Sequence, residues 1–339
     1  MSAIARLPRL GPLAKGILSY AVPQLRTVHS RENQLGTVLA ESCYSIFLRQ
    51  ISLLQKAGLH GVPKIVAELG PGSSLGTGFA ALIAGAEKYY AFDLINHSNP
   101  THNVTVFDKL VELFRQKTPI PNRGIHSLRF PDLPAYGFPP FLDLELDASF
   151  ERRISTIRKD ISNNAGGFVE MAAPWTCADI IKYGSVDWVF SNSVLEHVDE
   201  LEACYEAIAL WLKPRGIASH LIDFFSHGLT KDWNGHWAVG DAAWSALRGR
   251  RPYLLNRMPY SEHLRLAKKS GFEIIFEKRN KRFDGLIASQ FSDRFANITD
   301  EDARLRMVYV VMRLVKRNEA QGEQAAIDHP FPHEGTHRE

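Results

Sequence analysis

Residues 64–78 read KIVAELGPGSSLGTG and combine an apolar run, a carboxylate and a glycine-rich turn in that order. The apolar run from Lys64 to Leu69 predicts a short buried strand, and the residues after the turn predict a helix over Phe79 to Ala86. Glycines let such a turn bend tightly and approach a ligand closely, while the free N–H groups of the new helix face that ligand. The stretch therefore predicts a nucleotide-binding turn.

A second apolar run, from Lys88 to Phe92, predicts the next strand and ends in Asp93. A carboxylate at the carboxyl end of a strand can accept hydrogen bonds from two ribose hydroxyls, so we expect a nucleoside ligand. The dinucleotide pattern G-x-G-x-x-G would require glycine or alanine at position 75, where this chain has Leu75, and this weakens an NAD interpretation. On the glycines alone, an ordinary strand-to-helix turn is the alternative.

A second motif lies further along, where residues 185–216 read SVDWVFSNSVLEHVDELEACYEAIALWLKPRG. Val186 to Phe190 predicts a buried strand, and Leu201 to Leu212 has apolar residues at helical spacing. Pro214 and Gly216 predict the end of that helix. The next strand is predicted over Ile217 to Ile222.

These two motifs resemble those of the class I S-adenosylmethionine-dependent methyltransferases, in the forms E-x-G-x-G-x-x-x-G and D-x-V-x-S-x-x-V-L-E-H-V followed by L-K-P-x-G. The resemblance covers roughly residues 61–316 and extends to an uncharacterised bacterial subgroup, through segments such as SCYSIFLR at residues 42–49. It implies an enzyme with an α/β, Rossmann-like seven-stranded methyltransferase sheet and with S-adenosylmethionine as cofactor. The implied cofactor-binding residues are Glu68, Gly70, Pro71, Gly72, Ser73, Asp93, Leu94 and Asn192.

The spacing of the predicted strands indicates additions to this domain. Between Asp93 and the third strand, predicted over Gly166 to Met171, lie more than seventy residues, whereas a strand-helix-strand unit needs about thirty. We expect an insertion that either contributes to a lid or covers the surface away from the substrate. The predicted units are an N-terminal helical extension (1–60), the methyltransferase domain (61–317, with the insertion at 94–165) and a disordered tail (318–339).

Composition agrees with a cytoplasmic enzyme. The 339 residues are 45% hydrophobic, and a net charge of +3 is too small to favour a nucleic-acid ligand. There is no twenty-residue apolar run, so no transmembrane segment is expected. Cys43, Cys177 and Cys204 lack paired metal spacing and are predicted to be free thiols. The basic, apolar N-terminal segment predicts a helix that packs on the domain or forms a homodimer, with a membrane-surface or targeting helix as the alternative.

The chemistry expected from the cofactor is transfer of an already activated methyl group. The enzyme must hold the acceptor in line with the carbon–sulfur bond and exclude water, and a hydroxyl acceptor also needs a base. His197 is the first candidate base, with His220, Asp223 and His227 as further candidates. His197 could instead bond to backbone at a helix start, and Asn192 could either position the acceptor or cap the turn.

Two further features bear on the acceptor. Phe224 to Tyr260 is rich in aromatic residues and histidines, which suit either an acceptor pocket or core packing. Some methyltransferases bind a divalent metal at an E-x-x-E-H run, but Ser193 replaces the first glutamate, leaving Glu196 and His197, and His220, His227 or His236 would have to complete the site. We therefore predict no metal.

The sequence thus predicts methyl transfer to a small or medium organic acceptor, by O- or N-methylation. A carbohydrate or RNA acceptor is the alternative among enzymes. The alternative outside enzymes is a non-catalytic, methyltransferase-like regulatory partner. The acceptor itself is not encoded in any motif of the chain.

Overall fold

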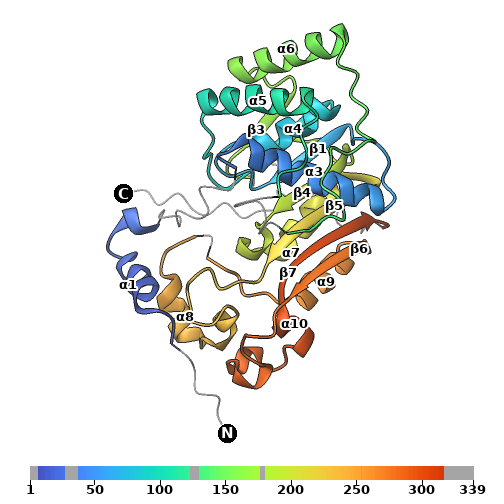
Figure 1. The fold of residues 1–339 in the computed structure, drawn as a ribbon. Helices are drawn as coiled ribbons and strands as arrows, with labels where there is room; N and C mark the ends of the chain where they lie inside the picture. The colour runs from blue at the N-terminus through green and yellow to red at the C-terminus, as the bar shows by residue number, and fades with distance from the viewer. Residues whose placement is uncertain (1–6, 27–36, 123–129, 176–179, 253, 317–339) are drawn as a thin grey trace.

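A seven-stranded sheet in the order β3-β2-β1-β4-β5-β7-β6 forms the centre of the molecule (Figure 1). The computed structural model describes residues 7–26, 37–122, 130–175, 180–252 and 254–316. β1 to β5 pair in parallel, and β7 is antiparallel to both of its neighbours. This confirms the predicted Rossmann-like methyltransferase sheet. The strands are β1 (Ile65–Leu69), β2 (Lys88–Phe92), β3 (Val169–Ala172), β4 (Val186–Asn192), β5 (Leu212–Asp223), β6 (Phe272–Lys281) and β7 (Leu305–Leu314).

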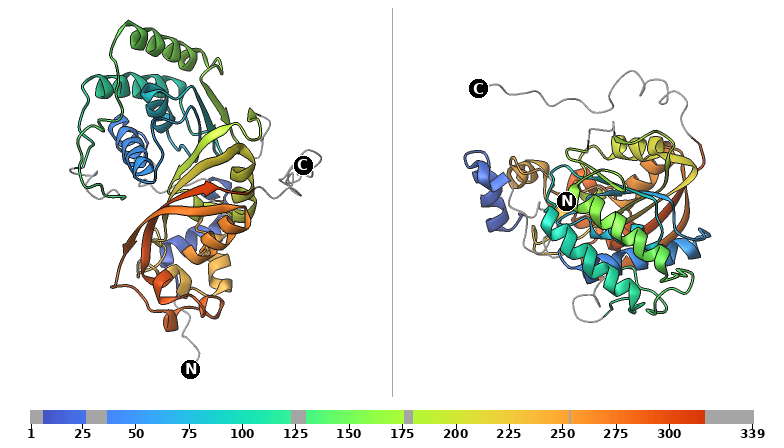
Figure 2. Two further views of the ribbon diagram at one scale, coloured as in Figure 1. Left: turned by 90° about the vertical axis from the view of Figure 1, so that its right-hand side faces the viewer. Right: turned by 90° about the horizontal axis from the view of Figure 1, so that it is seen from above.

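Helices cover both faces of the sheet, so that two hydrophobic cores form. Successive residues of a strand point to opposite faces, and accordingly Val66 packs in one core and Ala67 in the other. Figure 2 shows the helices on the two sides of the sheet. The first core contains α3 (Ala40–Lys56), α4 (Gly76–Ala84), α5 (Pro100–Arg115) and α6 (Ala148–Asn163), and the second contains α7 (Leu201–Trp211) and α9 (Tyr260–Lys269).

The starts of two strands differ from the sequence predictions by three residues or more. β3 begins at Val169 instead of Gly166, because the Asp160 carboxylate accepts the N–H groups of Gly167 and Phe168 at 2.7 and 2.9 Å. β5 begins at Leu212 instead of Ile217, because α7 runs directly into the strand. The predicted end of α7 before Pro214 is confirmed.

The connection between β2 and β3, predicted as an insertion at 94–165, carries α5 and α6. α6 packs on α5 and reaches α4 through Arg153, which donates to the carbonyl oxygens of Leu82, at 3.0 Å, and Ala86. Most of the connection therefore covers the outside of the helical layer. Residues 123–129 lie outside the described residues.

The N-terminal segment contributes α1 (Leu10–Leu18) and the 3-10 helix η1 (Pro23–Arg26). α1 packs against α8 (Asp241–Arg248) of the same chain, with Gly16 so close to Leu247 that a Cβ there would overlap its carbonyl group (Figure 2). Leu10 and Ile17 on α1 are exposed in the single chain. The predicted homodimer through these helices stays a prediction. Residues 27–36 of the predicted helical extension and the predicted tail, 318–339, lie outside the described residues.

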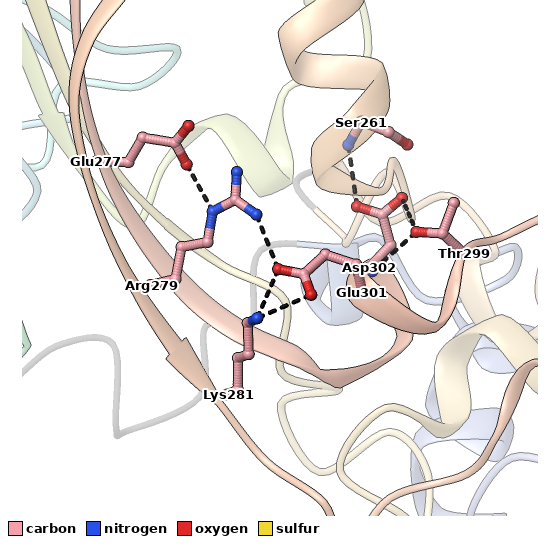
Figure 3. A network of polar contacts seen from close by, with 7 residues as sticks. All are labelled: Ser261, Glu277, Arg279, Lys281, Thr299, Glu301 and Asp302. Atoms are coloured by element: carbon pink, nitrogen blue, oxygen red, sulfur yellow. Dashed lines mark hydrogen bonds and ion pairs between the residues drawn. The ribbon is translucent and has the colours of Figure 1, made fainter.

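A polar network fixes the C-terminal part of the domain (Figure 3). Glu301 of α10 (Asp300–Arg304) accepts from Arg279 and Lys281 of β6, each at 2.8 Å. Asp302 accepts from the N–H of Ser261 at the start of α9, at 3.1 Å. Exposed ion pairs individually contribute little to stability. The main effect of this network is therefore to hold α10 against β6 and α9, which fixes the position at which β7 begins. None of the helices in the described ranges is long and apolar enough to span a membrane.

The packing of α4 on the sheet generates a stability prediction. A Cβ on Gly78 would overlap the ring of the fully buried Tyr89, so Gly78→Ala should lower the free energy of unfolding by about 1–3 kcal/mol through overpacking. Gly11→Ala is the control, because no atom lies within 4 Å of a Cβ there, and it should change stability by less than about 1 kcal/mol. Urea denaturation of both variants checks this, and equal stabilities would contradict the close packing.

Candidate functional site

A cavity of about 660 Å³ opens at the carboxyl ends of β1, β2, β4 and β5. Parallel strands end at the same edge, and ligands of open α/β sheets bind beyond that edge. The cavity is lined by Thr37, Val38, Ile46, Glu68, Leu69, Gly70, Pro71, Gly72, Ser73, Thr77, Phe92, Asp93, Leu94, His97, Trp175, Asn192, Ser193, Val194, His197, Val198, Cys204, Asp223 and His227.

The turn after β1 requires its glycines. Gly70 and Gly72 have φ values of 64° and 77°, in the left-handed region that disfavours other residues. A Cβ on Gly70 would also lie 2.5 Å from Val194 of the turn after β4. Thr37 supports the turn from outside, because its Oγ1 accepts from the N–H of Ser73 at 2.9 Å.

Glu68 is the buried carboxylate of the site. It is 2% exposed and accepts from the Tyr89 hydroxyl on β2 at 2.7 Å. Burial raises the pKa of Glu68 to about 8, although the Tyr89 hydrogen bond acts in the opposite direction. A ligand near Glu68 therefore meets a carboxyl group that titrates near neutral pH.

Asp93 lies beside Glu68 at the end of β2. Its Oδ1 accepts from the N–H of Leu94 at 2.7 Å. Burial raises the pKa of Asp93, against the lowering effect of hydrogen bonds from the backbone N–H groups of Leu94 and Ile95. Both carboxylates and the glycine turn face one cavity, which is the arrangement expected for a nucleoside site.

The structure brings most of the predicted site residues together, with one exception. All eight residues predicted to bind cofactor line the cavity, and so does His197. His220 does not, because the alternation along β5 turns it toward α7 and α9, whereas Leu221 faces the other core. The His220 ring is buried, and its Nδ1 lies 2.8 Å from Ser191 Oγ. Burial lowers the pKa of His220 to about 3. His220 therefore cannot act on an acceptor in this cavity.

A cluster of titratable groups stands at the far side of the cavity. His197 ends the 3-10 helix η4 (Leu195–His197), and its ring centroid lies 5.4 Å from that of His227. Glu196 is 3% exposed, and neither carboxylate oxygen has a hydrogen-bond partner within the described part of the chain. Burial and then the nearby Asp223 raise the pKa of Glu196 well above its usual range.

The same cluster bears on the prediction of no metal. Glu196, His197 and His227 each offer a donor atom, and these three atoms lie within 4.8 Å of one another. The sequence named two of these residues in the motif but had no means of selecting His227 over His220 and His236. His236 is buried, and burial lowers its pKa to about 3. Whether Glu196, His197 and His227 bind a metal ion can therefore be tested with a chelator.

The aromatic segment after β5 is core rather than pocket. Trp233, Trp237 and Trp244 are each at most 6% exposed and do not line the cavity, and among the described residues of 224–260 His227 alone does. Of the predicted free thiols, Cys43 and Cys204 are buried without a disulfide, and Cys177 lies outside the described residues. Tyr253 of the aromatic segment also lies outside them. Residues that the sequence did not single out, namely Thr37, His97 and Trp175, also line the cavity.

A second, smaller cavity of about 170 Å³ adjoins the first. The two share Ile46, Asn192, Ser193 and Asp223 as lining residues. Ser193 has a φ of 58°, a conformation that non-glycine residues adopt at a cost, and such strain is typical of functional sites. The remaining lining residues are Arg49, Gln50, Phe130, Pro131, Leu221, Arg306 and Met307.

The raised pKa of Glu68 predicts a pH effect on stability. Between its usual value of 4.5 and the folded value of about 8, the folded chain holds this proton more tightly than the unfolded chain. Stability should therefore fall as pH rises through this window, with a slope of at most about 1.4 kcal/mol per pH unit from this group. Glu68→Gln removes the titration, so the variant should gain on the wild type from pH 5 to pH 8 in denaturation experiments. Parallel stability curves would show that Glu68 titrates normally.

Comparisons with known proteins agree with this arrangement. The family described as a methyltransferase domain matches residues 157–219, which include β3, β4 and most of β5. No curated protein matches the chain. The CurJ carbon methyltransferase is similar in structure, with a TM-score of 0.41 and 12% identity over 91% of this chain and 66% of that protein.

Two other solved structures are similar to the same degree. Phosphoethanolamine N-methyltransferase 2 of Haemonchus contortus, in complex with S-adenosyl-L-methionine, has a TM-score of 0.41 and 15% identity over 86% of this chain and 61% of that protein. Geranyl diphosphate C-methyltransferase of Streptomyces coelicolor A3(2) has a TM-score of 0.41 and 12% identity over 81% and 78%. The chain thus spans less than two thirds of the length of the CurJ and Haemonchus proteins.

The matched residues include the turn after β4, which lines the cavity together with the glycine turn after β1. Over residues 157–219 the chain is therefore similar to the methyltransferase-domain family, and the seven-stranded sheet agrees with the resemblance to class I S-adenosylmethionine-dependent methyltransferases.

Proposed function

We propose that the chain transfers the methyl group of S-adenosylmethionine to a hydroxyl or amine of a small or medium organic acceptor. The observation that supports this proposal is a single cavity with two chemically different sides. Glu68, Asp93 and the glycine turn lie on one side, and His197, Asp223 and His227 lie on the other. A cofactor on the first side would direct its methyl group toward titratable groups on the second.

On the cofactor side, Asp93 is proposed to accept hydrogen bonds from the ribose hydroxyls. Gly70, Pro71, Gly72 and Ser73 would let the backbone approach the cofactor, because the left-handed turn exposes bare backbone there. Leu94, Asn192 and Glu68 complete the proposed contacts; Asn192 stands at the end of β4, between this side and the acceptor.

On the acceptor side, His197 is proposed as the general base for a hydroxyl acceptor. Histidine accepts a proton readily near neutral pH, and the His197 side chain borders the cavity. The His227 ring lies next to it, and the nearby Asp223 carboxylate would stabilise positive charge on this pair of histidines. Since the sulfonium already activates the methyl group, positioning and exclusion of water would provide the rest of the catalysis.

The volume of the cavity, about 660 Å³, favours a small acceptor over the alternatives of a carbohydrate chain or an RNA. A regulatory partner without activity would bind cofactor but never release S-adenosylhomocysteine. Release of that product in the presence of candidate acceptors therefore separates an enzyme from a regulatory subunit.

Asp93→Ala should weaken the binding of S-adenosylhomocysteine by about 1.5–3 kcal/mol, because the acceptor of two hydrogen bonds is removed. Isothermal titration calorimetry measures this loss, and NAD should show no comparable binding to the wild type. Asp143→Ala is the control, since Asp143 is exposed and does not line the cavity. An unchanged dissociation constant for Asp93→Ala would remove Asp93 from the proposed site.

His197→Gln should reduce turnover by roughly a hundredfold or more while cofactor affinity and melting temperature stay near those of the wild type. His60→Gln is the control, because His60 is exposed and outside the cavity. EDTA should leave the wild-type rate unchanged. Inactivation by EDTA that Mg²⁺, Mn²⁺ or Zn²⁺ reverses would instead assign Glu196, His197 and His227 to a metal, and unchanged turnover of His197→Gln would exclude both roles.

A further inference from the structure

We infer that the second cavity binds a carboxylate group of the acceptor, through the guanidinium of Arg306 and the side-chain amide of Gln50. This inference rests on the proposed function, because it concerns the end of the acceptor that lies away from the atom that receives the methyl group. The cavity adjoins the first one along Asn192, Ser193 and Asp223. An acceptor could therefore place its reacting atom at the shared wall and its distal group in the second cavity.

Arg306 provides a cation whose guanidinium lies over the Phe225 ring, 5.8 Å from its centroid. It lies at the start of β7, and its buried Nε has no hydrogen-bond partner. Within the described ranges, its guanidinium also makes no ion pair within 4 Å, although Asp223 and Asp284 are near enough to feel its charge. The polar network of Figure 3 fixes α10 directly before it.

Gln50 provides a second unused donor, whose direction is fixed by its neighbours. Its Oε1 accepts from the Ser219 hydroxyl at 2.8 Å, and that hydroxyl in turn accepts from Trp188 Nε1 at 2.8 Å. The acceptor end of the amide is thereby engaged, so Nε2 is the end left over. Gln50 is 2% exposed, and Nε2 has no partner. Buried donors are normally satisfied, so Nε2 is a donor that a ligand in this cavity could use.

Arg49 differs from Arg306, although both line the cavity. Its Nε donates to Ser45 Oγ, and its terminal nitrogens donate to the carbonyl oxygens of Pro131 and Pro121, at 3.1, 2.9 and 3.2 Å. Arg49 therefore holds the wall formed by Phe130 and Pro131, and it contributes positive charge rather than free donors.

The balance of charge and shape favours a carboxylate over a phosphate. Two arginines face one acidic side chain in this cavity, Asp223, and burial raises the pKa of Asp223. A planar carboxylate matches one guanidinium and one amide N–H, whereas a phosphate dianion beside Asp223 would require more free donors. The remaining lining is largely apolar, with Ile46, Phe130, Leu221 and Met307, so a hydrocarbon frame fits behind the charge.

The test is calorimetric titration of the full chain, saturated with S-adenosylhomocysteine, with benzoate, benzamide and phenyl phosphate. Benzoate should bind the wild type more tightly than the other two. Arg306→Met should weaken benzoate binding by about tenfold to a hundredfold and leave benzamide unchanged, and Arg306→Lys should restore part of the loss. Arg304→Met is the matched control, two residues away and outside both cavities, and it should bind benzoate like the wild type.

Three outcomes would overturn the inference: equal binding of benzoate and benzamide, unchanged benzoate binding by Arg306→Met, or tighter binding of phenyl phosphate. Melting temperatures establish that the variants fold, and Arg306→Gln replaces Arg306→Met if the latter does not. Since benzoate binding is measured without turnover, its loss is separable from a failure of methyl transfer. Failure of the wild type to bind S-adenosylhomocysteine would instead contradict the proposed function.

Discussion

A carboxylate buried beside the central strands is the constraint on which the site depends. Glu68 on β1 is held by the Tyr89 hydroxyl on β2, and the Tyr89 ring occupies the space that Gly78 of α4 leaves open. One hydrogen bond and one missing side chain thus tie together the two strands and the helix that frame the glycine turn. Because a buried carboxylate without such a partner would be costly, this tie also explains why a polar group is tolerated inside the core.

The alternation of side chains along the strands then decides which polar groups can reach a ligand. Asp223 and Leu221 face the helical layer of α3, and both line the second cavity. His220 lies between them on the strand and is therefore turned to the opposite core, where its ring lies edge-on to Tyr205 with the ring centroids 6.3 Å apart. A single register step separates a candidate catalyst from a core residue.

The sequence predicted the parts of the molecule that are local in the chain. The glycine turn, Asp93 and the end of β4 are each encoded within a few residues, and the parallel sheet brings the ends of such segments to one edge. It could not predict the second cavity, because Gln50, Phe130 and Arg306 come from three distant segments that only the folded sheet brings together. The position of His197 next to His227 required the path of the loop after β5, for which no local pattern exists.

This difference in origin has a consequence for function. The cofactor side is built by short segments at adjacent strand ends, and changing it would disturb β1, β2 and α4 together. The second cavity is built by single residues of α3, the β2–β3 connection, β5 and β7, and it shares Asn192, Ser193 and Asp223 with the first cavity. Substitution of one such residue changes the lining without altering the strand order or the glycine turn. Under the proposed function, the fold therefore determines the methyl donor, whereas the choice of acceptor depends on a few side chains that distant elements bring together.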